Sequence, residues 1–292
     1  MILAINYSDK NFERQRKYNT QTAYSKGKVN KVIEYSPNDL DPEFREKHKK
    51  ILSYTRGGGL WLWKPYIILK ALELLEEGDY LFYCDAGAYY VNKVQHLVNT
   101  LNKTNQSMMG FRLPLLARQF TKKECYRLMN CKESGENQIL SGYLLFKKDD
   151  FCIDFVKEWL KYATDERISS PTRFCFEIEE FSDFRTHRED QSIVSNLYYK
   201  YNLIPFKDPS QFGNRPWEYI WIPPYTWSEP WKYNPIEDKS MSKIYNFPQI
   251  VVSNRSANPY IYRIKESIKN FLFKVGLYNE VVYCKLQKAQ KE

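Results

Sequence analysis

The run Tyr80-Leu81-Phe82-Tyr83-Cys84-Asp85-Ala86-Gly87 indicates the architecture of the whole chain. Five consecutive apolar or aromatic residues follow Gly78-Asp79, and such a run is typical of a strand that is buried on both faces of a parallel sheet. Asp85 comes directly after the strand, and open α/β sheets bind ligands beyond the carboxyl ends of their strands. Asp85 therefore either holds a cation at the sheet edge, as carboxylates there commonly do, or only caps the following turn.

Strand and helix patterns alternate around this run. We expect strands at 1–7, 29–35 and 80–84 and helices at 12–26 and 64–76, the second with Pro65 in its first turn. Beyond them we expect a strand at 139–146 and helices at 149–162 and 190–201, with long connections at 163–186 and 207–258. This order predicts an α/β fold with a Rossmann-like, mostly parallel sheet flanked by helices, followed by an irregular, aromatic-rich C-terminal region.

The composition excludes several classes of protein. The chain has 292 residues, of which 16% are aromatic, and its net charge is +9. Such a chain is neither disordered nor collagen-like, and its charge favours anionic partners. No apolar run is long enough to predict a membrane-spanning helix, and the apolar N-terminus is short and lacks a basic start, which predicts a strand rather than an export signal. The six cysteines show no zinc spacing, so we expect reduced thiols and a cytoplasmic protein.

A glycine-rich segment precedes the second helix. Arg56-Gly57-Gly58-Gly59 fits neither the P-loop nor the dinucleotide-binding pattern, but it provides a flexible loop rich in backbone amides. Lys64 then stands in the first turn of the helix, where anions are favoured. Either a bound phosphate lies beside Lys64, or the lysine is simply solvated.

Two later segments combine polar and small residues. Ser141-Gly142 lies within an expected strand, where a glycine marks either the close approach of a ligand or of another backbone, or else a bulge. Asp190 and Gln191 follow His187 at the start of a helix. They either contact hydroxyl groups of a ligand or serve as an ordinary polar helix start.

In this order the segments resemble nucleotide-diphospho-sugar glycosyltransferases of the GT-A fold. The likeness is to the glycogenin-like and lipopolysaccharide-galactosyltransferase-like group, and to bacterial capsule or O-antigen transferases with a Trp-Lys-Pro-Tyr segment, here residues 63–66, and an Asp-Ala-Gly segment, here residues 85–87. It covers roughly residues 1–205. It implies a GT-A catalytic domain at 1–258, with a donor half at about 1–110 and an acceptor half at about 111–258.

The resemblance also implies a role for individual residues. On the donor side it implies binding of the nucleotide by Tyr7 and Ser8, and of the diphosphate by Lys64, Asp85, Ala86 and Gly87. On the acceptor side it implies Ser141 and Gly142, and near the transferred sugar the catalytic residues Asp190 and Gln191. The Asp-Gln pair favours retention of configuration, whereas Asp190 would be the general base of an inverting reaction.

A divalent cation is the cofactor that the resemblance implies. Asp85 matches the first acid of the Asp-X-Asp metal motif, but Gly87 replaces the second acid. The further ligand is then His187, a residue near Ser253-Asn254-Arg255, or water. An oxygen-dominated site suits Mn²⁺ or Mg²⁺.

The reaction that we expect transfers a sugar from a nucleotide-diphosphate sugar, with a UDP-sugar favoured, to a hydroxyl of a glycan or lipid-linked glycan in surface polysaccharide or glycan synthesis. One alternative is a basic protein that binds single-stranded nucleic acid, which would use the same charge and aromatic rings but would need no acid after the strand. Because no nucleic-acid-binding signature is found, we expect no such partner. A carbohydrate-binding module without catalysis is a further alternative.

The C-terminal third contains two distinctive segments. Residues 217–233 hold seven aromatic side chains, and Trp217 and Trp221 either bind the acceptor or pack within the loop. Residues 255–292 hold eight Lys or Arg and three Glu, and 259–292 show apolar residues at helical spacing. This pattern predicts a basic amphipathic helix that either lies on an anionic membrane surface, at the inner face, or docks on its own domain.

Overall fold

The computed structural model describes residues 1–133, 135–220, 246–254 and 258–289. Its centre is a six-stranded sheet in the order β2-β1-β3-β6-β5-β7. The strands are β1 (Ile2–Tyr7), β2 (Lys31–Tyr35), β3 (Tyr80–Cys84), β5 (Met108–Leu116), β6 (Asn137–Lys147) and β7 (Phe206–Lys207). Only β6 runs opposite to the others in this sheet. The prediction of a mostly parallel sheet in an α/β fold is confirmed.

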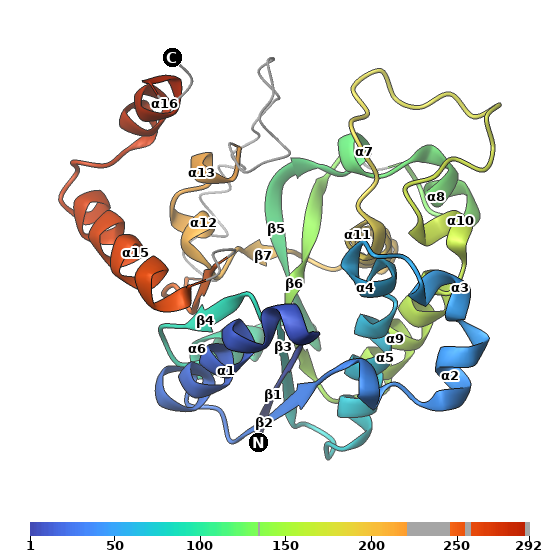
Figure 1. The fold of residues 1–292 in the computed structure, drawn as a ribbon, viewed down its shortest axis with the longest axis horizontal. Helices are drawn as coiled ribbons and strands as arrows, with labels where there is room; N and C mark the ends of the chain where they lie inside the picture. The colour runs from blue at the N-terminus through green and yellow to red at the C-terminus, as the bar shows by residue number, and fades with distance from the viewer. Residues whose placement is uncertain (134, 221–245, 255–257, 290–292) are drawn as a thin grey trace.

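Helices cover both faces of the sheet (Figure 1). One side carries α5 (Trp63–Glu73), α9 (Asp150–Ala163) and α11 (Glu189–Lys200), and the other carries α1 (Glu13–Thr22) and α6 (Gln95–Leu101). A small second sheet pairs β4 (Ala88–Tyr90) with β8 (Val251–Ser253). The shorter helices are α2 (Pro42–Lys47), α3 (Lys49–Leu52), α4 (Gly57–Leu60), α7 (Ala117–Phe120), α8 (Lys123–Leu128), α10 (Glu166–Ser169), α12 (Gln211–Asn214) and α13 (Trp217–Ile220). The chain continues into α15 (Pro259–Lys274) and α16 (Glu280–Ala289).

Strand β3 supplies side chains to two hydrophobic cores. Successive side chains of a strand point to opposite faces. Leu81 and Tyr83 pack with α5, α9 and α11, while Phe82 and Cys84 pack with α6 and the chain before β2. All four are fully buried, which explains why the strand reads as a continuous apolar run.

The expected elements are present, with shifted boundaries. The strand at 80–84 is found as predicted, and the helix expected at 64–76 is α5, which ends at Glu73. The helix expected at 12–26 becomes α1 and a π-helical turn at Ala23–Gly27. Neither β5 nor α6 was predicted from the sequence, and β7 has only two residues.

Parallel strands bring their carboxyl ends to one edge of the sheet. Asp9 follows β1 by two residues, Asp85 follows β3 directly, and Asp208 follows β7 directly. Because these three strands run in the same direction, the three carboxylates lie along a single edge.

Gly59 fixes the loop between α3 and α5. Its φ is +98°, and a Cβ there would come within 2.7 Å of Leu52 Cα. We expect Gly59→Ala to lower the free energy of unfolding by about 2 kcal/mol or more, because a left-handed backbone and a backbone clash add together. Urea denaturation measures this.

Gly78→Ala is the matched control. Gly78 also has a positive φ, +85°, but a Cβ at this position would have no atom within 4 Å. The control variant should lose only about 1 kcal/mol, the cost of the left-handed backbone alone. Equal losses in the two variants would show that the approach of Leu52 to Gly59 does not constrain the loop.

Candidate active site

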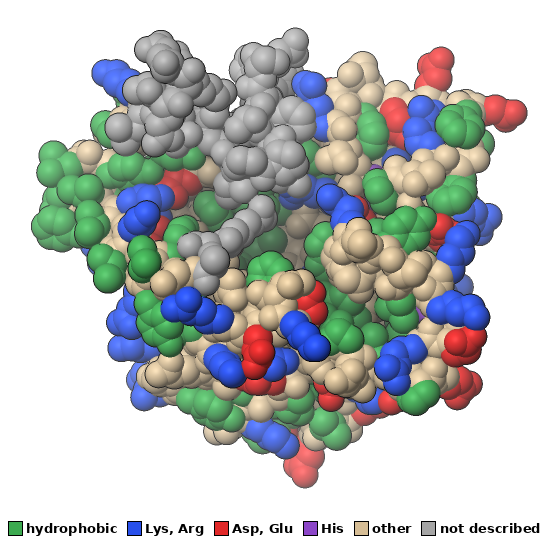
Figure 2. Space-filling model, viewed as in Figure 1, with side chains coloured by type: hydrophobic (Ala, Val, Ile, Leu, Met, Phe, Trp, Pro, Cys, Tyr) green, Lys and Arg blue, Asp and Glu red, His purple; other side chains and the backbone are tan. Residues whose placement is uncertain are grey.

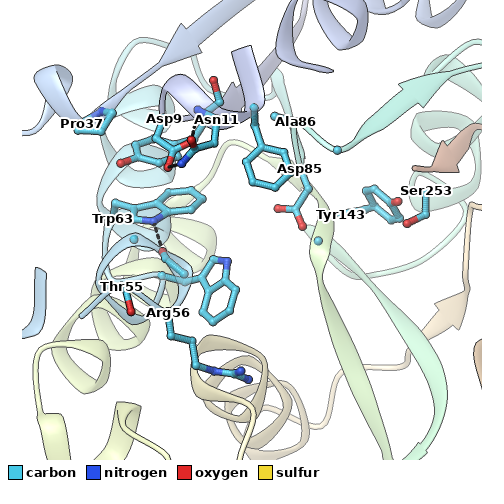
Figure 3. A pocket seen from close by; sticks show the side chains of 18 of the residues that line it. Asp9, Asn11, Pro37, Thr55, Arg56, Trp63, Asp85, Ala86, Tyr143 and Ser253 are labelled. Carbon is cyan, nitrogen blue, oxygen red and sulfur yellow. Dashed lines mark hydrogen bonds between the residues drawn. The ribbon is translucent and has the colours of Figure 1, made fainter. Parts of the chain in front are cut away.

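A cavity of about 1100 Å³ lies at this edge of the sheet. All three strand-end carboxylates contribute to its wall. The other lining residues are some of those at 7–12, 37–58, 61–63, 85–87, 140–143, 208–219 and 253–254. In Figure 3, Asp85 lies between a side that carries Asp9, Asn11 and Trp63 and a side that carries Tyr143 and Ser253. The two sides of the cavity therefore differ in chemistry, because one carries aromatic and amide groups and the other carries hydroxyl groups.

An aromatic pair forms the first side of the cavity. The rings of Tyr7 and Trp63 are stacked, with centroids 3.7 Å apart and planes 11° from parallel. Trp63 is held in place because its Nε1–H donates to the carbonyl of Gly57 at 2.8 Å. Beside the pair, Asp9 Oδ1 accepts the backbone N–H of Asn11 at 2.9 Å. Flat rings beside paired donors and acceptors suit a planar heterocycle.

Asp85 occupies the middle of the cavity. Its backbone N–H donates to the carbonyl of Gly142 at 2.9 Å, and Tyr83 donates its hydroxyl to Asp85 Oδ1 at 2.5 Å. A Cβ on Gly142 would come within 3.0 Å of Asp85 Oδ2. Both explanations for this glycine find support. The group that approaches it closely is the Asp85 side chain, and the pairing of β6 with β5 shifts register between Leu140 and Leu145, on either side of Gly142.

Lys64 lies beneath Asp85 and is buried, with 1% of the residue exposed. Its ammonium is 2.6 Å from Asp190 Oδ2, 3.7 Å from Asp85 Oδ1, and 3.3 Å from the carbonyl of Ser141. Burial alone would lower the pKa of Lys64, but Asp190 and Asp85 outweigh it, so the pKa is raised. The ammonium therefore stays charged and holds β3, β6 and α11 to the start of α5.

This arrangement changes the interpretation of four predicted residues. Lys64, Ser141 and Asp190 do come together, but they lie under the cavity and are not among the residues that line it. The anions beside Lys64 are protein carboxylates. Gln191 is also buried, and its Nε2 donates to Gln138 Oε1 at 2.6 Å. Asp190 is engaged by Lys64, so it is poorly placed to accept a proton from an acceptor.

The other residues for which donor binding was predicted line the cavity. They are Tyr7, Ser8, Asp85, Ala86 and Gly87. Gly142 lines it as well, on the β6 side.

His187 does not fit the predicted role of metal ligand. Its Nε2 is 2.8 Å from the carbonyl of Ile168, and its Nδ1 accepts the backbone N–H of Lys122 at 3.3 Å. Burial, with a smaller effect from Lys122, lowers the pKa of the ring to about 3. Both nitrogens are engaged, so neither has a lone pair for a cation, and the prediction for His187 is corrected.

The carboxylate of Asp85 remains as the candidate ligand. Within 1–133, 135–220, 246–254 and 258–289, no group of three His, Cys, Asp or Glu side chains could hold a metal ion. A single carboxylate fits Mg²⁺ or Mn²⁺ only where a substrate phosphate and water complete the coordination. The described residues therefore fit a cation that arrives with a diphosphate, and they do not fit a resident protein cage.

The aromatic segment at 217–233 is described only in part. Trp217 packs against Phe273 of α15, with ring centroids 5.9 Å apart, and does not line the cavity. Tyr219, two residues later, does line it. Trp221 lies outside the described residues.

Asp208 and a basic wall were not predicted from the sequence. Arg45, Lys49 and Arg56 all line the cavity. Arg56 pairs with Glu189 at the start of α11. An acidic residue directly after a strand was a usable signal for Asp208, but a two-residue strand shows no periodicity.

The buried ion pair makes a prediction about stability. Lys64→Met would leave Asp190 buried without its cation, so we expect a loss of about 3–5 kcal/mol in the free energy of unfolding. Adding Asp190→Asn to Lys64→Met should recover part of this loss. The control is Lys200→Met, which removes a partly exposed pair with Glu158 and should cost less than about 1 kcal/mol. A Lys64→Met variant as stable as the control would contradict the proposed importance of the pair.

No family model matches the sequence, and no curated protein matches it. Among solved structures, the galactosyltransferase LgtC in complex with donor and acceptor sugar analogs is 12% identical, with a TM-score of 0.47 and coverage of 88% of this chain and 87% of that chain. Mouse xyloside xylosyltransferase 1 is 8% identical, with a TM-score of 0.46 and coverage of 89% of this chain and 99% of that chain. GlyE of Streptococcus pneumoniae is 11% identical, with a TM-score of 0.42 and coverage of 87% of this chain and 54% of that chain. The chain is similar in outline to these solved glycosyltransferases.

Proposed function

We propose that the chain is a glycosyltransferase that transfers a sugar from a nucleotide-diphosphate sugar, with a UDP-sugar favoured, to a hydroxyl of a glycan or lipid-linked glycan. The observation that carries the proposal is the order of groups along one cavity. A stacked aromatic pair comes first, a carboxylate above a buried cation comes next, and hydroxyl-bearing side chains follow. A nucleotide sugar presents a base, a diphosphate and a sugar in the same order.

The base and ribose would lie on the side of Tyr7 and Trp63. Asp9 and Asn11 supply an acceptor and donors for the edge of the base, and Ser8 lines the same side. Such groups fix the orientation of a ligand whose faces are held by apolar contacts.

The diphosphate would lie over Asp85, and its negative charge must be offset for it to leave. When bound there, Mn²⁺ or Mg²⁺ would neutralise the leaving diphosphate. The chain itself provides the small residues Ala86 and Gly87, which leave room for the phosphates, and a wall with Arg45, Lys49 and Arg56. Lys64 fixes Asp85 from below and so orients the carboxylate before the ligand arrives.

A binding screen with Asp85→Asn tests this proposal. The wild type should be stabilised against heat by one of UDP-, GDP- or dTDP-sugars in Mn²⁺, and less so in EDTA. Asp85→Asn should lose the metal-dependent part of the shift and at least about 100-fold in kcat/KM for sugar transfer.

The control for this screen is Asp154→Asn, since Asp154 is exposed on α9 and is not among the residues that line the cavity. Its shift and activity should match the wild type. Full metal-dependent transfer by Asp85→Asn would contradict the proposal. Stabilisation by a single-stranded oligonucleotide and by no nucleotide sugar would favour the nucleic-acid-binding alternative.

We further propose that α15 lies on an anionic membrane surface. The helix docks on the domain with its polar side, where Glu266 pairs with the buried Arg215, and Lys269 is 3.1 Å from Glu218. A row of its apolar side chains points outward; Ile261, Ile264, Ile268 and Phe271, and Val275 just after the helix, are each at least half exposed. Figure 2 shows apolar side chains gathered at the edge of the molecule where Figure 1 places α15.

The polar side of α15 thus supports docking on the chain's own domain, and the apolar side supports contact with a membrane. The two alternatives for the tail use different sides of one helix. An outward apolar stripe on a segment with a net charge of +5 over 255–292 suits lipid headgroups above acyl chains. No helix in the described parts of the chain is long and apolar enough to cross a membrane.

Vesicle pelleting tests the membrane proposal. Wild type should pellet with vesicles that contain about one third anionic lipid, and Ile264→Asp with Phe271→Asp should abolish pelleting, because charge on the lipid-facing side is costly in the interface. Leu74→Asp is the matched control, since Leu74 is 63% exposed on the chain after α5 and should change nothing. Pelleting of the double variant at the wild-type level would rule out this face as the anchor.

A further inference from the structure

Asp208 is a buried carboxylate in the cavity wall that the sequence patterns did not single out. It follows β7 directly, at the edge of the sheet that also carries Asp85. Only 6% of the residue is exposed, yet it lines the cavity.

The two oxygens of Asp208 have different surroundings. Oδ1 accepts the backbone N–H of Ser210 at 2.6 Å, which fixes the side chain. Oδ2 is buried and accepts no hydrogen bond from any residue in the described part of the chain. A buried oxygen without a donor is costly, so its retention at the wall of a cavity points to a ligand that supplies one.

Backbone contacts hold the chain around Asp208. The carbonyl of Pro209 accepts the backbone N–H groups of Ile250 and Val251 at 2.8 and 3.2 Å. A Cβ on Gly213 would come within 2.0 Å of the Asp208 carbonyl, so the turn into α12 requires glycine. The orientation of the carboxylate is therefore set before any ligand binds.

Asp208 interacts electrostatically with two charged or titratable side chains, those of Lys207 and Tyr143. Burial raises the pKa of Asp208 to about 6, although the hydrogen bonds from Ser210 and the charge of Lys207 act in the opposite direction. Lys207 is directed to Asn214 Oδ1, at 2.7 Å. Asp208 in turn helps to raise the pKa of Tyr143, after the larger effects of burial and Cys84, and Asp85 raises it less.

The turn that follows Asp208 lies beside Ser253. Gln211 Nε2 donates to the carbonyl of Ser253 at 2.9 Å, and the backbone N–H of Ser253 donates to Gln211 Oε1 at 2.9 Å. Asp208 therefore belongs to the side of the cavity that carries Tyr143 and Ser253. Trp63, on which Tyr7 stacks, lies on the other side of Asp85. If the ligand is a nucleotide-diphosphate sugar, as proposed above, the part that lies across the diphosphate from the base is the sugar.

We propose that Asp208 Oδ2 accepts a hydrogen bond from a sugar hydroxyl and so selects the substrate of the transfer. The inference rests on the proposed function and deepens it. Phe212 and Tyr219, which stack edge to face with centroids 5.1 Å apart, line the cavity as well and offer ring surface to the same sugar. The hydroxyl belongs either to the acceptor or to the transferred sugar. Loss of the hydrogen bond raises the KM for the acceptor in the first case and the KM for the donor in the second.

Asp208→Asn is the test variant, because it keeps the shape of the side chain but puts an amide donor or a neutral acceptor in place of the carboxylate. We expect kcat/KM to fall about 10- to 100-fold, as for loss of a hydrogen bond to a charged group. A rise in acceptor KM assigns the hydroxyl to the acceptor, and a rise in donor KM, with slower donor hydrolysis in the absence of acceptor, assigns it to the transferred sugar. A deoxy analogue that lacks the bound hydroxyl should be used equally well by the variant and the wild type.

Two measurements keep the proposal falsifiable if the variant is poorly active for another reason. The melting temperature of Asp208→Asn at pH 7.5 should not fall below that of the wild type, because the change removes a buried charge. In the wild type, the affected KM should rise as the pH falls below about 6, because protonation removes the ionised acceptor. The control Asp183→Asn, outside the cavity lining and paired with Arg118, should leave both KM values unchanged.

The outcomes separate this inference from the proposed function. If the wild type neither binds nucleotide sugars nor transfers a sugar, the proposed function fails, and Asp208 loses its assigned ligand with it. If the wild type transfers a sugar and Asp208→Asn does so with unchanged KM values and unchanged discrimination against every deoxy analogue, the inference about Asp208 is wrong while the function stands.

Discussion

The buried ammonium of Lys64 is the interaction on which the candidate active site depends. It lies at the start of α5 and contacts Asp190 on α11, Asp85 after β3 and Ser141 on β6, so four elements meet at one charge. A buried cation without partners is strongly unfavourable, so the elements that provide its carboxylates and carbonyl are held in a single arrangement. The direction in which Asp85 faces the cavity follows from this requirement. So does the position of the floor of the cavity, which Lys64, Ser141 and Asp190 form.

The cavity above that floor is built by the direction of the strands. β1, β3 and β7 end at the same edge, and each is followed by a carboxylate that lines the cavity, while β6 runs the other way and brings Gly142 and Tyr143 into the wall. The three carboxylates differ in their surroundings. Asp9 lies beside aromatic rings, Asp85 lies over a cation, and Asp208 is buried with one oxygen unpartnered within the described residues. A single edge can therefore hold the chemically distinct parts of one extended ligand.

How far the sequence predicts these features depends on the length of the pattern that encodes each of them. The five-residue run at 80–84 predicted both β3 and the position of Asp85. The spacing of Ile261, Ile264 and Ile268 predicted one amphipathic helix over 259–292, where the structure has two helices, α15 and α16. Lys64 was recognised as a cation in a first turn, but local rules could not show that its anions come from Asp190 and Asp85, which are distant in sequence. His187 looked like a metal ligand because nothing local reveals that both its nitrogens bond to the backbone. Asp208 was missed because β7 is too short to show alternation.

The most direct measurement is a crystal structure with a non-hydrolysable nucleotide-sugar analogue and Mn²⁺. We expect electron density in the cavity, with the base beside Tyr7 and Trp63, the diphosphate and a cation at Asp85, and a sugar hydroxyl within hydrogen-bond distance of Asp208 Oδ2. Lys64 should still contact Asp190. An analogue bound outside the cavity, or a Lys64 side chain that has left Asp190 to contact the phosphates, would contradict this assignment of the site.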